Sequence, residues 1–205
     1  MEKIRAIVFD VYGTLASIGD KRRPFAKLIR LGETRGRART NNDHHLLMSS
    51  PLSLREAADI LGIKATPAEL EGLEGDLEKE LESITLYPEV LSTIRALQDR
   101  GIKIAVCSNL AAAYAPPITE LLPMRLDTYA WSFEVRALKP DLRIYEHVCN
   151  ALGCPPHQVL MVGDTREADV DGPREFGMQS ILLDRRSMQN TRSRLSSLSG
   201  LLELV

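Results

Sequence analysis

The sequence predicts an α/β protein with a parallel sheet, helices on both faces of that sheet, and a helical segment inserted near the N-terminus. Short apolar runs alternate with stretches of helical spacing, and one long region contains no strand-like run. The 205 residues have a net charge of −2, and 44% of them are hydrophobic. These values are typical of one globular domain, or of one domain with a smaller insertion, and give no indication of nucleic-acid binding.

Four apolar runs predict strands at residues 4–9, 102–107, 159–162 and 180–183. Between them, hydrophobic residues recur every three or four positions in segments 87–98, 141–152 and 167–176, which predicts helices. Parallel neighbours need a crossover of a dozen or more residues, and helices of this length supply it. The alternation therefore indicates βαβ units and a parallel, Rossmann-like core.

Residues 18–85 interrupt this alternation and are expected to form a helical cap, leaving 1–17 and 86–205 as the α/β core. Two capping boxes, Ser53 with Glu56 and Thr66 with Glu69, predict helix starts. Segment 21–39 contains eight Lys and Arg residues and a single acid, Glu33. Some of these cations face an anionic substrate, or they form a solvated surface that offsets the acidic helix further along; both interpretations stay open.

No stretch of the sequence is long and apolar enough to predict a membrane span. The first ten residues lack the pattern of a secretory signal. Three scattered cysteines without a CxxC pair suit a reducing compartment better than a disulfide framework. We therefore expect a cytoplasmic protein whose partner is a small molecule, not a nucleic acid or a membrane.

Polar residues follow the predicted strands and the apolar segment 131–138. They are Asp10, Tyr12, Gly13 and Thr14 in FDVYGTL, Ser108 and Asn109 in VCSN, Lys139 in LKP, and Asp164 and Asp169 in VGDTREAD. Ligands of parallel α/β sheets bind at the carboxyl ends of the strands. Together these residues offer a carboxylate nucleophile, a hydroxyl and an amide for an anion, a lysine to neutralise charge, and further carboxylates for a divalent cation.

In order and spacing, these four motifs resemble those of the haloacid dehalogenase (HAD) superfamily, and the cap lies where that family inserts one. The resemblance implies a hydrolase in which Asp10 is the nucleophile and Lys139 stabilises developing charge. It implies that Thr14, Ser108 and Asn109 orient and bind the transferring group. It also implies Mg²⁺ as cofactor, held by Asp10, Asp164 and the backbone carbonyl of Tyr12, with Asp169 in support.

One position departs from the pattern of the family's phosphatases. Tyr12 stands where most of them carry an acid–base aspartate, and DVYGTL is instead similar to the 2-haloacid dehalogenases. A phenol, with a pKa of about 10, can donate a proton to a leaving group but is a poor base at neutral pH. The fourth motif, by contrast, retains Asp164 and Asp169 of the Mg²⁺-dependent enzymes.

Three hypotheses follow. The preferred one is a Mg²⁺-dependent phosphatase of a small phosphorylated metabolite, working through an aspartyl phosphate on Asp10. The second is a 2-haloacid dehalogenase. The third is a catalytically weak domain that binds a phosphorylated ligand or a partner.

Overall fold

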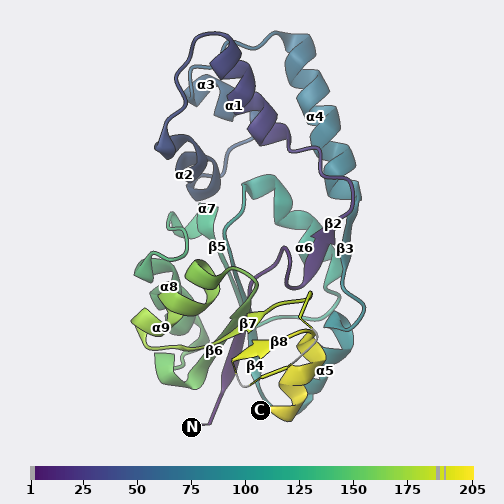
Figure 1. The fold of residues 1–205 in the computed structure, drawn as a ribbon, viewed down its shortest axis with the longest axis vertical. Coiled ribbons are helices and arrows are strands. Elements are labelled where there is room, and N and C mark those ends of the chain that lie inside the picture. Colours follow the sequence, from purple (N-terminus) through teal and green to yellow (C-terminus); the bar gives the residue numbers. More distant parts are fainter. Residues whose placement is uncertain (1–2, 188–189, 192) are drawn as a thin grey trace.

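A six-stranded parallel sheet forms the centre of the molecule, in the order β5-β4-β1-β6-β7-β8 (Figure 1). The structure is a computed structural model that describes residues 3–187, 190–191 and 193–205. The strands are β1 (Ala6–Phe9), β4 (Lys103–Ser108), β5 (Thr128–Trp131), β6 (Val159–Gly163), β7 (Gln179–Leu183) and β8 (Arg194–Leu195). The α/β prediction is confirmed, and all four apolar runs are strands.

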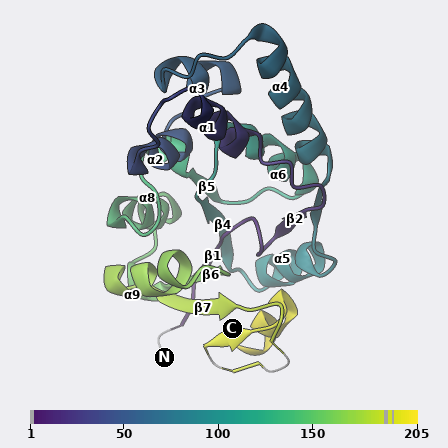
Figure 2. The same ribbon diagram turned by 45° about the horizontal axis from the view of Figure 1, so that its top comes forward.

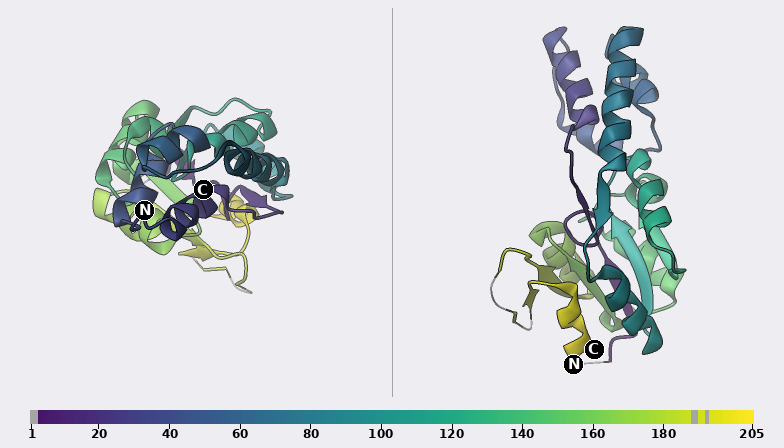
Figure 3. Two further views of the ribbon diagram at one scale, coloured as in Figure 1. Left: turned by 90° about the horizontal axis from the view of Figure 1, so that it is seen from above. Right: turned by 90° about the vertical axis from the view of Figure 1, so that its right-hand side faces the viewer.

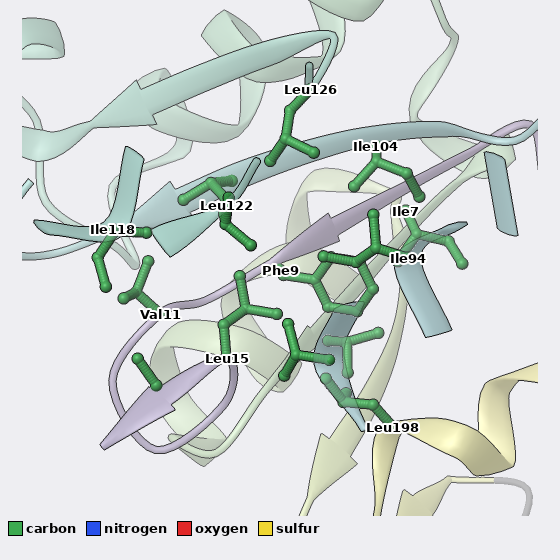
Figure 4. Packing of buried hydrophobic residues seen from close by; sticks show 14 of the residues in the cluster. Ile7, Phe9, Val11, Leu15, Ile94, Ile104, Ile118, Leu122, Leu126 and Leu198 are labelled. Carbon is green, nitrogen blue, oxygen red and sulfur yellow. The ribbon is translucent and has the colours of Figure 1, made fainter. Parts of the chain in front are cut away.

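Both faces of the sheet are buried, as expected for parallel strands that sit between helices. Along β1, Ile7 and Phe9 point into one core cluster that also contains Ile94 and Leu198 (Figure 4). That face is covered by α5 (Val90–Asp99), α6 (Pro116–Leu121) and the 3₁₀ helix η4 (Leu198–Glu203). The alternate β1 residues face the opposite core, under α8 (Leu142–Leu152) and α9 (Gly172–Phe176).

The helix predicted at 167–176 is two elements, a π-helix η3 (Arg166–Asp171) followed by α9. Two further 3₁₀ turns are η1 (Ala112–Tyr114) and η2 (Pro156–Gln158). The apolar segment 131–138 that precedes Lys139 is not a strand of its own. Strand β5 ends at Trp131, the short helix α7 (Ser132–Val135) follows, and Lys139 enters from the loop beyond it. Arg136, at φ 58, takes the left-handed conformation that ends α7.

Four helices lie beyond the carboxyl edge of the sheet, and we call them the cap: α1 (Pro24–Thr34), α2 (Asn41–Ser49), α3 (Leu54–Ile60) and α4 (Pro67–Glu82). Both predicted capping boxes are present, at Ser53 and at Thr66. The sequence motifs indicated α3 and α4 but not α1 or α2. Figures 2 and 3 show the cap over one end of the core, with both chain termini at the other end.

A short antiparallel ribbon joins cap and core. It pairs β2 (Ala16–Ile18) with β3 (Ile84–Leu86), at the two places where the chain leaves and re-enters the sheet domain. The expectation that 18–85 contains no strand is therefore wrong at both ends, because three-residue strands are too short to show an alternating pattern. Within the described part of the chain, no helix has the length and apolar character needed to cross a bilayer.

Candidate active site

The ends of three adjacent strands bring the predicted site residues together. Phe9 pairs with Val106 on one side and with Val162 on the other, so the residues that follow β1, β4 and β6 share one edge of the sheet. Asp10 follows β1, Ser108 ends β4, and Asp164 follows β6. This edge faces the cap (Figure 1).

Asp10 is held through one of its two carboxylate oxygens. Its Oδ1 accepts a hydrogen bond from Ser108 Oγ at 2.9 Å and from Lys139 Nζ at 2.8 Å. The residue is only 8% exposed, and Oδ2 has no hydrogen bond to the described residues. The carboxylate is therefore fixed at one oxygen, and its second oxygen makes no hydrogen bond to the described residues.

Lys139 lies between two carboxylates. Besides Asp10, it donates to Asp169 Oδ1 at 2.6 Å, and it is buried. Burial opposes the charged form of this lysine, but the negative charges of Asp10 and Asp169 outweigh burial and raise its pKa above the usual range. Asn109 positions it, since its side chain accepts from the backbone N–H of Lys139 and donates to the carbonyl, both at 2.8 Å.

Three carboxylates converge beside this lysine. Asp10, Asp164 and Asp169 each offer an oxygen, and these oxygens lie within 4.8 Å of one another. Burial and the charge of Asp10 raise the pKa of Asp169 to about 6, although Lys139 opposes this. Burial and Asp10 also raise the pKa of Asp164, which has no ion pair among the described residues. Negative charge is therefore in excess at the open side of the cluster.

Two glycines make room for these carboxylates. A Cβ on Gly13 would lie 2.0 Å from Asp164 Oδ2, and one on Gly163 would lie 2.3 Å from the Asp169 carboxyl carbon. Gly13 also has φ +92, a backbone conformation that favours glycine. Each carboxylate thus occupies the space that a side chain at the facing glycine would fill.

Thr14 is fully buried, and its hydroxyl has no hydrogen-bond partner among the described residues. Buried hydroxyls in native structures are nearly always bonded. An unsatisfied hydroxyl four residues after Asp10 is a donor available to a bound group.

Tyr12 points its phenol toward the cap side of the site. The Tyr12 hydroxyl donates to the carbonyl of Tyr114 at 2.8 Å, and the two rings meet edge to face. Burial, aided by the charge of Glu80, raises the pKa of Tyr12 above its usual value. Its proton is both committed to a carbonyl and hard to remove, so the expectation that this phenol protonates a leaving group receives no support from the geometry.

The sequence analysis missed Arg185, which follows β7. Arg185 donates to the carbonyls of Gly13 (3.2 Å) and Thr14 (2.6 Å), pairs with Glu89 at 2.7 Å, and lies 3.5 Å from the centre of the Tyr87 ring. It therefore holds the turn that follows Asp10. Its position just beyond a strand end was a signal of the same kind that identified Asp164.

Parallel α/β topology, inserted helices and an aspartate–lysine cluster at the sheet edge define a hydrolase fold of the HAD type. The chain belongs to the haloacid dehalogenase-like hydrolases, whose family model matches residues 4–177. The resemblance drawn from the four motifs is thereby confirmed.

Relatives of known name carry out two different reactions. The (S)-2-haloacid dehalogenase 1 of Pseudomonas sp. (strain CBS-3) is 28% identical over 100% of this chain and 98% of its own length. The ribulose-1,5-bisphosphate 5-phosphatase of Halopiger xanaduensis is 29% identical over 51% of this chain and 44% of its own. A dehalogenase crystal structure shares the fold, with a TM-score of 0.69, 22% identity, and coverage of 100% and 98%. Likeness alone does not choose between these reactions.

Proposed function

We propose that this chain is a Mg²⁺-dependent phosphatase of a small phosphorylated metabolite, acting through an aspartyl phosphate on Asp10. The observation that carries the proposal is the carboxylate cluster, in which Asp164 lies beside Asp10 and forms no ion pair with any residue that the structure describes. A dehalogenase needs no such group, and an unpaired carboxylate disfavours the ionised state of a neighbouring nucleophile.

The residues present fit a hard divalent cation. Their donors are carboxylate oxygens, the set that Mg²⁺ prefers. We expect Asp10 and Asp164 to hold the ion, together with the Tyr12 carbonyl. Both oxygens of Asp169 are already hydrogen-bonded, to Lys139 and to the Thr165 N–H, so we assign it a supporting role. When bound, the ion supplies positive charge against the phosphate oxygens and the nucleophile.

The chain's own residues then account for the transfer. Ser108 and Lys139 fix Asp10 Oδ1, so Oδ2 attacks phosphorus, a bond forms from Oδ2 to phosphorus, and the bond to the substrate oxygen breaks. Lys139 and the Thr14 hydroxyl are placed to stabilise the charge on the phosphoryl group. Water then cleaves the aspartyl phosphate and releases inorganic phosphate with Asp10 restored.

Protonation of the leaving oxygen is the weak step of this reaction. Since the Tyr12 proton is bound to the Tyr114 carbonyl, the substrate oxygen departs largely without help from position 12. We therefore expect turnover to depend steeply on leaving-group basicity, with aryl phosphates cleaved much faster than alkyl phosphates.

The decisive experiment measures phosphate release from an aryl phosphate with Mg²⁺ and with EDTA. Wild type is compared with Asp10→Asn and Asp164→Asn, and the exposed carboxylate of Asp171 gives the matched control Asp171→Asn. We expect Mg²⁺-dependent release that falls to background in Asp10→Asn. Asp164→Asn should lose more than the roughly 10- to 100-fold typical of a supporting residue. Release that persists in Asp10→Asn would overturn the assignment of the nucleophile.

A second candidate is a 2-haloacid dehalogenase, favoured by Tyr12 and by the dehalogenase that is similar over the whole chain. Here Asp10 would displace a halide, which leaves without a proton. Halide release from a 2-haloacid, assayed on the same variants, separates the two. Release that is indifferent to EDTA and survives Asp164→Asn supports the dehalogenase, and silence in both assays favours a binding role.

A further inference from the structure

We propose that the substrate carries a second anionic group, remote from the reacting phosphate, and that cap arginines Arg23, Arg30 and Arg39 bind it in a chamber between cap and core. The proposal rests on the proposed phosphatase function and specifies the substrate class of the same site.

The chamber has a volume of about 520 Å³, within the range of small-molecule sites. Its core wall includes Tyr12 and Asn109. Tyr12 is two residues from Asp10, and Asn109 follows Ser108, which bonds to Asp10. Asp10 itself does not line the chamber, but Tyr12 and Asn109 connect the chamber to the turns that carry Asp10 and Ser108. A substrate whose phosphate lies at Asp10 would therefore extend its other end past these two residues toward the cap.

The middle of the chamber is apolar. Side chains from both sides line it, among them Phe25, Ile29, Leu47, Met48 and Leu110. Such a lining favours a substrate with a hydrocarbon segment between its two ends, and it lowers the local dielectric, which strengthens any ion pair formed beside it.

The basic segment of the cap divides into paired and unpaired cations. Four of its cations are committed to carboxylates at 2.6 to 3.0 Å: Arg22 and Lys27 to Asp76, Arg35 to Glu69, and Arg37 to Asp43. Arg23, Arg30 and Arg39 have no side-chain hydrogen bond or ion pair within the described ranges, and these same three line the chamber. Lys21 likewise has no partner among the described residues, but it does not line the chamber.

Two acids also line the chamber, and they offset its positive charge only in part. Glu80 is buried and already engaged, accepting from the Tyr114 hydroxyl and from the Arg23 backbone N–H. Glu33 is exposed and forms no ion pair with a described residue. Three arginines against two carboxylates leave an excess of positive charge.

Arg23 adopts a conformation that is rare for its residue type. It sits at φ 55 and ψ 53, in the left-handed region, at the start of α1. The bond from its N–H to Glu80 holds it there. Residues kept in such conformations cluster at ligand sites, and this one places an unpaired guanidinium at the chamber.

Guanidinium groups of this kind recognise carboxylate or phosphate by paired hydrogen bonds. The expected substrates are therefore phosphate monoesters with a short hydrocarbon spacer and a terminal carboxylate or second phosphate. A guanidinium group can bind either terminal group, so the test includes substrates of both kinds.

The test uses ω-carboxyalkyl phosphates of increasing length, each matched with its neutral methyl ester, and alkyl bisphosphates of the same lengths. The readout is the ratio of kcat/KM for the acid to that for its ester within each variant, which cancels losses common to both, such as partial unfolding. In wild type we expect the acid to be preferred by roughly 10- to 100-fold at one optimal length, the gain typical of a charged hydrogen bond. Comparing kcat/KM for the bisphosphate with kcat/KM for the carboxylate of the same length identifies which second anion the chamber prefers.

Arg30→Gln and Arg39→Gln should lower that ratio toward one, mainly through KM, and Arg30→Lys should restore part of it. Arg35→Gln is the matched control, because Arg35 pairs with Glu69 away from the chamber, and its ratio should equal that of wild type.

Two failures are distinguishable. If wild type cleaves aryl phosphate but prefers neither the acid nor the bisphosphate to the neutral ester at any length, or if Arg30→Gln and Arg39→Gln retain the full preference, this inference is wrong and the phosphatase stands. If wild type releases no phosphate from any of these compounds, the proposed function itself fails.

Discussion

At the scale of single residues, Tyr12 separates this chain from the phosphatases whose acid–base aspartate it replaces. The side chain serves as a structural contact between core and cap side, with its hydroxyl bonded to the Tyr114 carbonyl. A substitution at position 12 can therefore add an acid–base group without altering Asp10, two residues away.

Tyr12→Asp tests this directly. A carboxyl group there would protonate the leaving oxygen and later activate water, which is worth roughly 100- to 10,000-fold. We expect a rise of that order with an alkyl phosphate and a smaller one with an aryl phosphate, because a good leaving group needs little protonation. Both rates are measured by phosphate release at saturating Mg²⁺.

Tyr12→Phe is the control, since it removes the phenol but keeps the ring, and it should give no such rise. An unchanged or lower rate in Tyr12→Asp would mean that the acid–base group lies elsewhere. A loss of about 100-fold in Tyr12→Phe would instead identify the phenol as the acid.

At the scale of elements, one buried ion pair organises the cap. Asp43, in the first turn of α2, accepts hydrogen bonds from both terminal nitrogens of Arg37 and from the backbone N–H and the hydroxyl of Thr40. Arg37 also donates to the Leu61 carbonyl, beyond the end of α3. This one ion pair therefore connects the segment after α1 with the start of α2 and the end of α3.

Asp43 should make the stability of the protein depend on pH. The hydrogen bonds from Arg37, against the cost of burial, hold the pKa of Asp43 well below its usual range. The folded state thus gains stability that is fully present above about pH 4, the unfolded pKa, and is lost as pH falls through the folded pKa. Asp43→Asn should unfold with about 3 kcal/mol less free energy at pH 7, and the difference from wild type should shrink below about pH 4.

Urea unfolding at a series of pH values measures this difference. Asp59→Asn, an exposed carboxylate on α3, is the control and should change the free energy of unfolding by less than about 0.5 kcal/mol. A difference between wild type and Asp43→Asn that is constant with pH would contradict the ion-pair explanation.

Elements with strong local signals could be predicted from the sequence, and those that depend on tertiary contacts could not. The strands at Asp10, Ser108 and Asp164 are continuous apolar runs, and α3 and α4 begin with capping boxes. The ribbon β2–β3 is too short for a pattern, and α1 is obscured by the cations on its exposed face. The residue types at the site were predictable because strand ends meet at one edge, whereas Tyr114 and Glu80 join it only through the packing of the cap.

At the scale of the whole molecule, Arg185 connects parts of the chain that are far apart in sequence. It joins the turn after β1, the start of α5 through Glu89, and the segment after β7. Burial disfavours the charged Glu89 carboxylate, but its hydrogen bond with Arg185 prevails and lowers the pKa of Glu89. The shape of the turn that carries the Tyr12 carbonyl thus depends on residues from both ends of the protein.

Arg185→Ala should loosen that turn and raise the Mg²⁺ concentration needed for half-maximal phosphate release by about tenfold, as for other residues that orient metal ligands. Arg185→Lys keeps the charge near Glu89 but cannot reach both carbonyls. Its half-maximal Mg²⁺ concentration should therefore lie between those of wild type and Arg185→Ala. The exposed neighbour Arg186 gives the control Arg186→Ala. A wild-type Mg²⁺ requirement in Arg185→Ala, with the protein folded by circular dichroism, would show that the turn holds its shape alone.

The cap contacts the core at separate points. Ser132 donates to the Met48 carbonyl of α2 at 2.6 Å, and the Tyr114 hydroxyl donates to Glu80 of α4 at 3.0 Å. Together with the β2–β3 ribbon, these contacts fix the cap over the sheet edge, which encloses the chamber on two sides.

The close fit of Gly13 against Asp164 and of Gly163 against Asp169 also bears on how such a site can change over generations. Any side chain at either glycine would displace the carboxylate opposite. A lineage can therefore vary these glycines only after it has given up the matching aspartate, and with it the acidic cluster. We expect each glycine to be replaced only in descendants that have already lost its aspartate, so that the proposed metal-dependent chemistry ends with the aspartate while the surrounding fold drifts gradually.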